Sequence, residues 1–332
     1  MGVSGAVLFV PFYTIVFPLL GYHLQPVQAV QIGLFTEIFG FLSSATAFWR
    51  RGLIDFKIAG FALFFAIPTA IVGGYLANRL PGSWLLLIIG VALVSFAFLL
   101  LHEARASKEA ETKTLDRPMR AIQFPVKQHR DRHGRVYTYR MQNDLLRATA
   151  TFFGGLFQGL VGFAAGEVST AEQVVRGVPV RLAVGNAHFI IAGASLAAAA
   201  THIAVVASEK GTIPWNILAA SVPAVLIGGQ IAGFIAGRLP QHVLQMVMAR
   251  FLIFIGVISL YRAMLGLGWH LPPWLLLMTL LAFLASIVLY LAGEGNLIAS
   301  GVSALAAASV ARIRSRGCGS SCCRKEDEEG LP

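Results

Sequence analysis

The sequence predicts an all-α polytopic membrane protein. It should contain two homologous four-helix repeats with broken, glycine-rich helices, followed by one or two extra C-terminal helices. Three observations lead to this prediction: few charged residues, long apolar runs and an internal repeat. Of the 332 residues, 56% are hydrophobic and 13% are charged. A soluble domain has about 25% charged residues, so the composition favours a chain embedded in a lipid bilayer.

Apolar runs recur along the chain at about the 20 residues that a helix needs to cross a bilayer. They lie at 3–20, 27–49, 58–77, 84–101, 146–168, 182–206, 215–236, 243–265 and 274–291. A shorter, Ala-rich run lies at 297–310, so the segment 266–311 is expected to add one or two helices. The segment 312–332 is expected to be a disordered tail. Its cysteines (Cys318, Cys322 and Cys323) could be palmitoylated, bind a metal or stay reduced.

The segment 103–145 is a loop rich in Lys and Arg, within a chain of net charge +10. Basic loops beside membrane spans face the cytoplasm, so this charge requires no nucleic-acid partner. If the loop is cytoplasmic, the turn at Arg50 and Arg51 also lies inside. The link 21–26, which has no Lys or Arg, then lies outside, as the same rule requires. The later part of the loop alternates in polarity and turns near Gly134, which predicts a small β-hairpin.

The two halves of the chain resemble each other. Three pairs of segments match in the same order: 2–11 and 162–171, 29–35 and 183–189, and 52–81 and 211–240. We therefore expect a first transmembrane repeat at 1–102 and a second at 146–265. With four spans each, both repeats would enter the membrane from the same side, unless the broken first span of each is re-entrant. No half-span precedes the first glycine motif, so we expect a truncated or misassigned start.

Glycines interrupt the first span of each repeat near mid-membrane. The candidate substrate-binding positions at these interruptions are Gly2, Ser4, Gly5, Gly162 and Gly166. Irregular backbone at that depth occurs where protein buries it or where it lines a cavity. Paired broken helices at equivalent places indicate a transporter site. The alternative is close helix packing through small residues.

Polar residues also lie inside the predicted spans. Glu37 is in the middle of the second run, and Glu167 follows the second glycine motif. Both are candidate ion-coupling groups, because a charge at mid-membrane costs about 2.5–3.5 kcal/mol and is kept for a function or a partner. Gln31, Asn186 and His188 are candidate substrate contacts, since each is a polar residue in a span near a glycine motif or its counterpart.

Arg250 is the candidate cationic contact, because it lies deep in a predicted span. It could pair with Glu37 or Glu167, or it could bind an anionic substrate. Gln158 precedes the glycines and could point to the same place. His202 is expected at the membrane interface and is left out of the site.

The chain has no enzyme signature. Its Asp residues all lie in loops or the tail, which excludes an intramembrane aspartyl protease with two buried carboxyl groups. It has no HExxH zinc motif and no GxxxxGK[ST] phosphate-binding motif. We therefore expect a protein that is not an enzyme and that holds no cofactor and no metal ion.

The segments "GVSGAVLFVPF" and "GLVGFAAGEV", with the "GG…LA…RLP" pattern, resemble the glycine-rich motifs of the sulfite exporter TauE/SafE family. The resemblance covers residues 2–265 and implies an inner-membrane carrier that exports small sulfur-containing or organic anions with an ion gradient. Ser4, Ala6, Ala164 and Ala165 stand where the family usually has glycine. Glu167 stands where it usually has an apolar or small residue.

We therefore expect a secondary transporter of a small anion such as sulfite or sulfoacetate, coupled to protons or another ion. It would lie in the cell inner membrane as a multi-pass protein, in contact with lipid, and could form homo-oligomers. The alternative is a membrane scaffold that transports nothing and whose loop and tail bind a cytoplasmic partner. A scaffold would have no need of the ionisable residues inside the spans.

Overall fold

The computed structural model describes residues 6–22, 24–112, 126–132, 134–140, 144–209, 212–236 and 241–293. Gly2, Ser4 and Gly5, the run 297–310 and the C-terminal tail with its cysteines lie outside these residues. The elements are α1 (Ala6–Leu19), α2 (Pro26–Arg50), α3 (Phe56–Arg79), α4 (Gly82–Thr112), β1 (Val126–Arg130), β2 (Val136–Arg140), α5 (Asp144–Val161), α6 (Ala165–Val175), α7 (Val180–Ser208), α8 (Trp215–Ala236), α9 (Gln241–Gly266) and α10 (Trp274–Gly293).

The prediction of an all-α polytopic membrane protein is confirmed. Among the described residues, α2, α3, α4, α7 and α9 are long and apolar enough to cross a membrane, and α1, α5, α8 and α10 contain shorter apolar stretches. The helix α4 continues to Thr112, beyond the boundary expected at 102. Its last turns are rich in Ala, Glu and Lys, which favour helix even where a bilayer no longer requires it.

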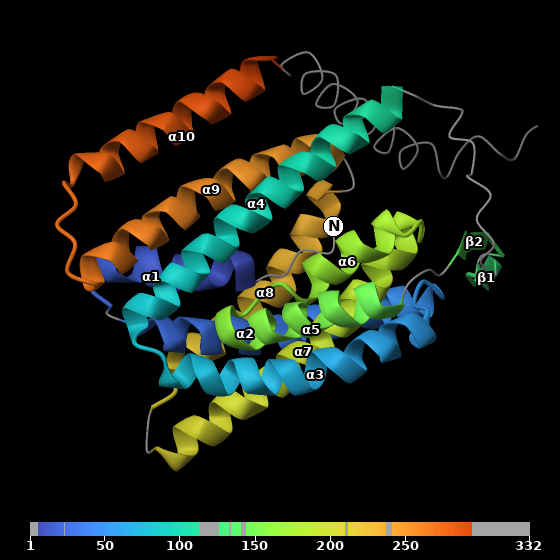
Figure 1. The fold of residues 1–332 in the computed structure, drawn as a ribbon, viewed down its shortest axis with the longest axis horizontal. Helices are drawn as coiled ribbons and strands as arrows, with labels where there is room; N and C mark the ends of the chain where they lie inside the picture. Colours follow the sequence, from blue (N-terminus) through green and yellow to red (C-terminus); the bar gives the residue numbers. More distant parts are fainter. Residues whose placement is uncertain are drawn as a thin grey trace, which may run out of the picture.

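The helices pack in two groups (Figure 1). One contains α4, α9 and α10, with α4 lying along α9 and α10 along the other side of α9. The other contains α2, α3, α5, α6 and α7, with α8 against α2. The contact α2–α7 joins the helices that carry the matching segments 29–35 and 183–189, and α4–α9 joins the helices that follow the third matching pair. A two-fold relation between the repeats would bring these counterparts together, although the repeat itself stays a prediction.

The run 146–168 is not one continuous span, because α6 folds back along α5. Three observations give an antiparallel register: Arg147 pairs with Glu172, a Cβ added at Gly154 would meet the Cα of Ala165 at 3.2 Å, and Gln158 accepts from the N–H of Ala165. Both ends of the α5–α6 pair therefore lie on one side of the bundle. This is the re-entrant arrangement that the sequence analysis allowed as an exception. Four complete spans in each half were the reason to expect both repeats to enter from the same side, and a re-entrant pair removes that reason.

Glycines bring α3 and α5 into close contact. A Cβ added at Gly159 would overlap the carbonyl oxygen of Ala70, and one added at Gly155 would overlap the carbonyl oxygen of Ala66. Small residues allow two membrane helices to approach backbone to backbone, which is how they gain van der Waals contact without a hydrophobic driving force. The approach places the end of α5 deep between α3 and α7.

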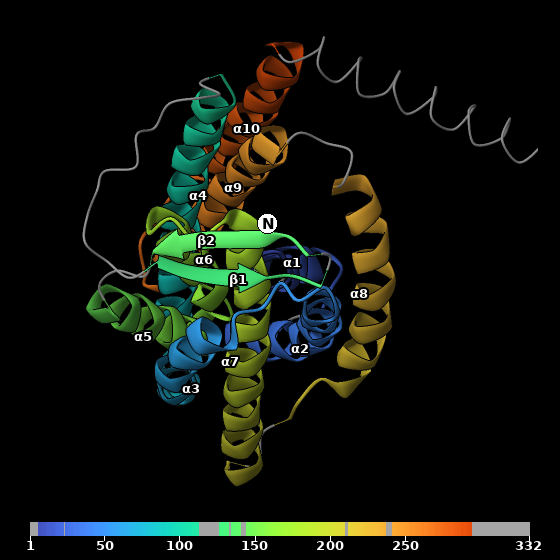
Figure 2. The same ribbon diagram turned by 90° about the vertical axis from the view of Figure 1, so that its right-hand side faces the viewer.

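The predicted hairpin is present, and it covers the end of the bundle that faces the viewer in Figure 2. His129 Nε2 donates to the carbonyl of Gly52 at 2.8 Å, and the N–H of Arg132 donates to the carbonyl of Arg51 at 3.1 Å. The Tyr139 hydroxyl donates to Asp55 Oδ2, while Asp55 Oδ1 caps the first turn of α3. The hairpin is thus attached to the α2–α3 turn.

Asp55 is the main anchor of the hairpin. Burial alone would raise the pKa of its carboxyl group. The hydrogen bond from Tyr139, the charge of Lys127 at 3.8 Å and the two N–H groups of the first α3 turn together outweigh burial and lower that pKa below its usual range. The pKa of the Tyr139 hydroxyl is raised mainly by burial and, as the second cause, by its hydrogen bond to Asp55.

Candidate functional site

The site begins at the interruption between α5 and α6. Gly162 has φ +92°, and Ala164 has φ +112°, a left-handed conformation that costs a non-glycine residue about 1–3 kcal/mol. This conformation explains why a family with the same motif would carry glycine at position 164. A Cβ on Gly162 would meet Ala6 and Val10 of α1 at 3.3 and 3.4 Å. The interruption therefore lies against the first turns of α1, which follow the other glycine motif.

Gln158 replaces backbone hydrogen bonds at the interruption. Its Oε1 accepts from the N–H of Ala165 at 3.1 Å, and its Nε2 donates to the carbonyl of Gly162 at 3.1 Å. Backbone groups inside a membrane must be satisfied within the protein. One buried side chain satisfies a donor and an acceptor of the broken helix, which makes Gln158 a structural centre of the site.

Glu37, in α2, is hydrogen-bonded to the side chain of Gln158. It is 1% exposed, and its Oε2 accepts from Gln158 Nε2 at 2.9 Å and from Ser195 Oγ at 3.0 Å. Gln158 Nε2 also lies 2.8 Å from Ser195 Oγ. Side chains from α2, α5 and α7 thus converge on one carboxyl group beside the broken helix. The structure places this predicted ion-coupling residue at the predicted interruption.

Glu167 lies on the other side of the interruption. It is 3% exposed, and its Oε2 accepts from the N–H of Ala164 at 3.1 Å, so it caps the beginning of α6. A carboxylate is favoured near a helix N-terminus by the N–H groups and the helix dipole. The structure thus brings Glu37 and Glu167 to the same break, one through Gln158 and the other through the backbone.

A second polar chain runs beside the first and includes a histidine that the sequence analysis assigned to the interface. Gln31 Nε2 donates to Asn78 Oδ1 at 3.3 Å, Asn78 Nδ2 donates to His202 Nδ1 at 2.8 Å, and His202 Nε2 donates to the carbonyl of Gly159 at 3.1 Å. His202 is fully buried. The sequence contained one signal of this buried position: His202 follows Ser195 by seven residues, which puts both side chains on one face of α7.

Asn186 and His188 lie at the start of α7, toward the hairpin end. Asn186 is fully buried, and it accepts from the N–H of Asp55 at 2.7 Å and donates to Gln173 Oε1 at 2.8 Å. His188 donates from Nδ1 to the carbonyl of Val184 at 2.6 Å and lies between two phenylalanine rings of α2. The structure shows these residues joining helices; contact with a substrate stays a prediction.

Arg250 has partners other than the two carboxyl groups considered from the sequence. Its Nε donates to Ser286 Oγ at 2.9 Å, its Nη1 donates to the carbonyl of Met246 at 2.9 Å, and its guanidinium lies 4.2 Å from the ring centre of Tyr290. These contacts place it between α9 and α10 rather than at the broken helix. The sequence analysis considered pairing only with Glu37 or Glu167, whereas α10 supplies two of the neighbours of Arg250 in the structure.

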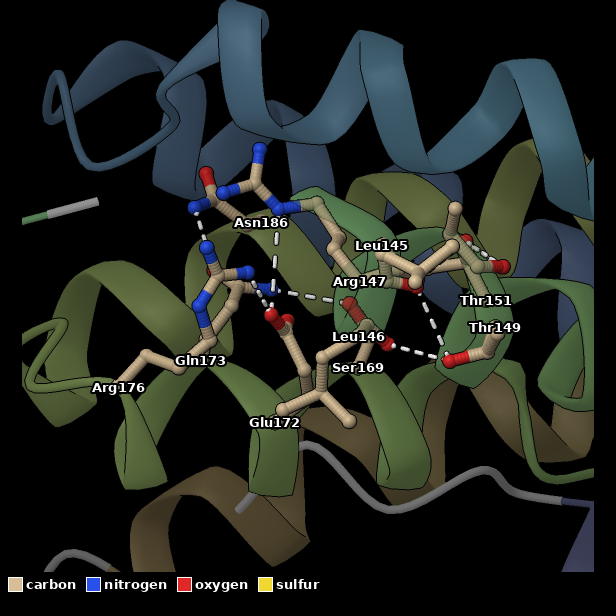
Figure 3. A network of polar contacts seen from close by, with 11 residues as sticks. Leu145, Leu146, Arg147, Thr149, Thr151, Ser169, Glu172, Gln173, Arg176 and Asn186 are labelled. Carbon is tan, nitrogen blue, oxygen red and sulfur yellow. Dashed lines mark hydrogen bonds and ion pairs between the residues drawn. The ribbon is translucent and has the colours of Figure 1, made fainter. Parts of the chain in front are cut away.

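A buried ionic cluster occupies the other end of the α5–α6 pair (Figure 3). Glu172 Oε1 forms ion pairs with Arg147 Nε, at 3.9 Å, and with Arg176 Nη1. The three side chains are 4–6% exposed. Sequence reasoning missed this cluster because Arg147 lies directly after the basic loop, where a positive charge is expected, and because Arg176 was not considered. Within the described residues, no three His, Cys, Asp or Glu side chains are grouped as metal ligands.

Comparison with known proteins agrees with these features. The family model "Sulfite exporter TauE/SafE" matches residues 1–259. The chain is 24% identical over 267 residues to the "Probable membrane transporter protein YunE" of Bacillus subtilis (strain 168), which covers 79% of this chain and 92% of that protein. No solved structure matches the chain significantly. Apolar helices, a broken span and the family match together lead to one conclusion: the protein is a multi-pass membrane transporter that belongs to the sulfite exporter TauE/SafE family.

Proposed function

We propose that the protein is a secondary transporter that exports small sulfur-containing or organic anions, such as sulfite or sulfoacetate, across the cell inner membrane with the help of a proton or ion gradient. The family description supports the sulfur-containing anion. The observation that carries the coupling is the burial of Glu37 against Gln158 and Ser195, beside the broken helix.

The chemistry of the carboxyl groups supports proton coupling. Glu37 and Glu167 lie at one interruption, and an anion that enters with both ionised would be repelled. Protonation of either carboxyl group lowers that repulsion by removing one like charge. Binding of the anion and binding of the proton would then favour each other, which is the thermodynamic basis of coupling.

The arrangement of the helices supports alternating access. We infer an inverted relation between the repeats, in which α5 and α6 re-enter while α2 and α7, and α4 and α9, are counterparts. In transporters of this type the site lies at the repeat interface, and one unit moves against the other around it. Glu37 in α2 and Ser195 in α7 then hydrogen-bond across the repeat interface.

The test is flux into proteoliposomes with an imposed pH gradient, using sulfite, sulfoacetate, thiosulfate and acetate. The gradient should drive accumulation of at least one sulfur-containing anion, and collapsing it should abolish accumulation. Glu167→Gln, which mimics the protonated acid, should allow exchange of the anion but lose accumulation if Glu167 carries the coupled proton. Normal accumulation in that variant would leave Glu167 as the helix cap alone. Absence of flux for every anion by folded wild-type protein would refute the proposed function.

A further inference from the structure

The cluster of Arg147, Glu172 and Arg176 joins two guanidinium groups to one carboxylate, and its side chains are nearly inaccessible. Two guanidinium groups share one carboxylate oxygen, Glu172 Oε1. Arginine keeps its charge in proteins, so the charge of Arg176 cannot be removed by loss of a proton. A buried charge requires compensation, and a polar ligand of opposite charge is one way to supply it.

Arg176 shows where a ligand would bind. Its Nη1 is used by Glu172, but Nε and Nη2 are buried and have no hydrogen-bond partner, in a side chain that is 6% exposed. These two nitrogens form one edge of the guanidinium plane. Their N–H groups are parallel and match the two oxygens of a carboxylate, sulfite or sulfonate group in a bidentate bond.

The surroundings of this edge are polar and come from several helices. Gln173 of α6 and Asn186 of α7 lie beside Arg176 and hydrogen-bond to each other (Figure 3). Asn186 also accepts a hydrogen bond from the N–H of Asp55, the residue to which the β1–β2 hairpin is attached. The cluster is therefore enclosed by the start of α7 and the α2–α3 turn, both of which would have to shift for an anion to enter.

We propose that Arg176, supported by Arg147, binds the oxyanion group of the transported solute at this end of the α5–α6 pair, and that Glu172 occupies part of the site when no anion is bound. The proposal rests on the anion transport proposed above and adds a binding group that the sequence analysis had assigned to Arg250. The same helix pair carries Gln158 and Glu167 at its other end, so movement of the pair would link anion binding to the carboxyl groups.

A purely structural cluster is the alternative. Breaking a buried ion pair by removing one partner destabilises a protein whether or not the cluster binds a ligand. The single variant Arg176→Gln is therefore ambiguous. The double variant Arg176→Gln with Glu172→Gln removes one charge of each sign and replaces both side chains by amides. Because Arg147 then loses its ion pair with Glu172, the melting temperature of this variant is measured beside its binding. Arg176→Lys keeps the charge but loses the bidentate edge.

The experiment measures direct binding to the purified full-length protein in detergent, with no gradient. Labelled sulfoacetate is the probe, and unlabelled methanesulfonate, acetate and chloride are competitors. The wild type should bind sulfoacetate saturably. Methanesulfonate or acetate, but not chloride, should displace it, and which of the two competes better identifies the sulfonate or the carboxylate as the recognised group. Arg176→Lys should raise the Kd about tenfold or more, and the double variant should not bind.

Arg79→Gln is the matched control, because Arg79 forms an exposed ion pair with Glu209 at 3.1 Å and should leave binding unchanged. Wild-type affinity in the folded double variant, or no saturable binding by the wild type, would overturn the inference. If the wild type binds the probe as expected but proteoliposomes show no flux, the transport proposal fails and the site stands. If flux occurs with an unchanged KM in the double variant, the transport proposal stands and the site fails.

Discussion

Two substitutions of Glu37 separate the hydrogen bonds made by its carboxyl group from its ability to carry a proton. Gln158 Nε2 and Ser195 Oγ both donate to the same oxygen, Oε2. In Glu37→Gln, one amide oxygen can accept both bonds, but the side chain no longer titrates. In Glu37→Leu, the volume is similar and the acceptor is lost. The first variant should be close to the wild type in stability, and the second should be less stable.

The cost of Glu37→Leu follows from the acceptors that remain. The two N–H groups of Gln158 still have the carbonyl of Gly162 at 3.1 Å and Ser195 Oγ at 2.8 Å. The hydroxyl of Ser195, which is fully buried, loses its acceptor. One buried donor left unsatisfied costs about 1–3 kcal/mol, so we expect a loss of about 2 kcal/mol for Leu and a smaller loss for Gln, which keeps an acceptor for Ser195.

Thermal unfolding in detergent measures the first part of this prediction, and proteoliposome flux measures the second. Glu37→Gln should keep the wild-type melting temperature, exchange the anion across the membrane and lose accumulation driven by a pH gradient. Glu37→Leu should melt at a lower temperature. Two results would refute the reasoning: gradient-driven accumulation by Glu37→Gln, or equal destabilisation by Gln and Leu. The first would remove the coupling role, and the second would show that the hydrogen bonds at Oε2 do not decide stability.

Three further predictions concern the break, the helix contact and the hairpin. Ala164→Gly should stabilise the protein by about 1 kcal/mol, because relief of the left-handed conformation exceeds the entropy cost of glycine; a lower melting temperature would contradict this. Gly159→Ala should destabilise by about 2 kcal/mol through overlap with α3, whereas Gly60→Ala, with open space at its Cβ, should not, as parallel melting curves can check. The hairpin should be protected from proteolysis above the ordinary carboxyl pKa and should lose this protection as the pH falls through the lowered pKa of Asp55. It should also lose protection in alkali, as the pH rises through the raised pKa of Tyr139. In Tyr139→Phe, the loss of protection on acidification should occur at a higher pH, because Asp55 loses the hydrogen bond that lowers its pKa.

The local features of this protein were readable from its sequence because each depends on neighbouring residues. Apolar length indicates a span. Clustered glycines indicate a weak point in a helix, and the break between Val161 and Ala165 is where they predicted it. The insertion cost of a carboxyl group identified Glu37 and Glu167, and both lie at that break. Polarity alternation indicated the hairpin, which is present.

Contacts between distant segments were decided only by the tertiary structure. Hydropathy counts apolar residues but does not distinguish a straight span from α5 folding back into α6, so the sequence placed 146–168 across the membrane. That reversal brings Arg147 and Arg176 to one carboxylate, although 29 positions separate them. For Arg250 the sequence left two possibilities open, a carboxylate partner or an anionic substrate, because an arginine within a span requires a partner that the sequence does not name. The partner came from α10, because packing selects among all groups within reach and the sequence order does not.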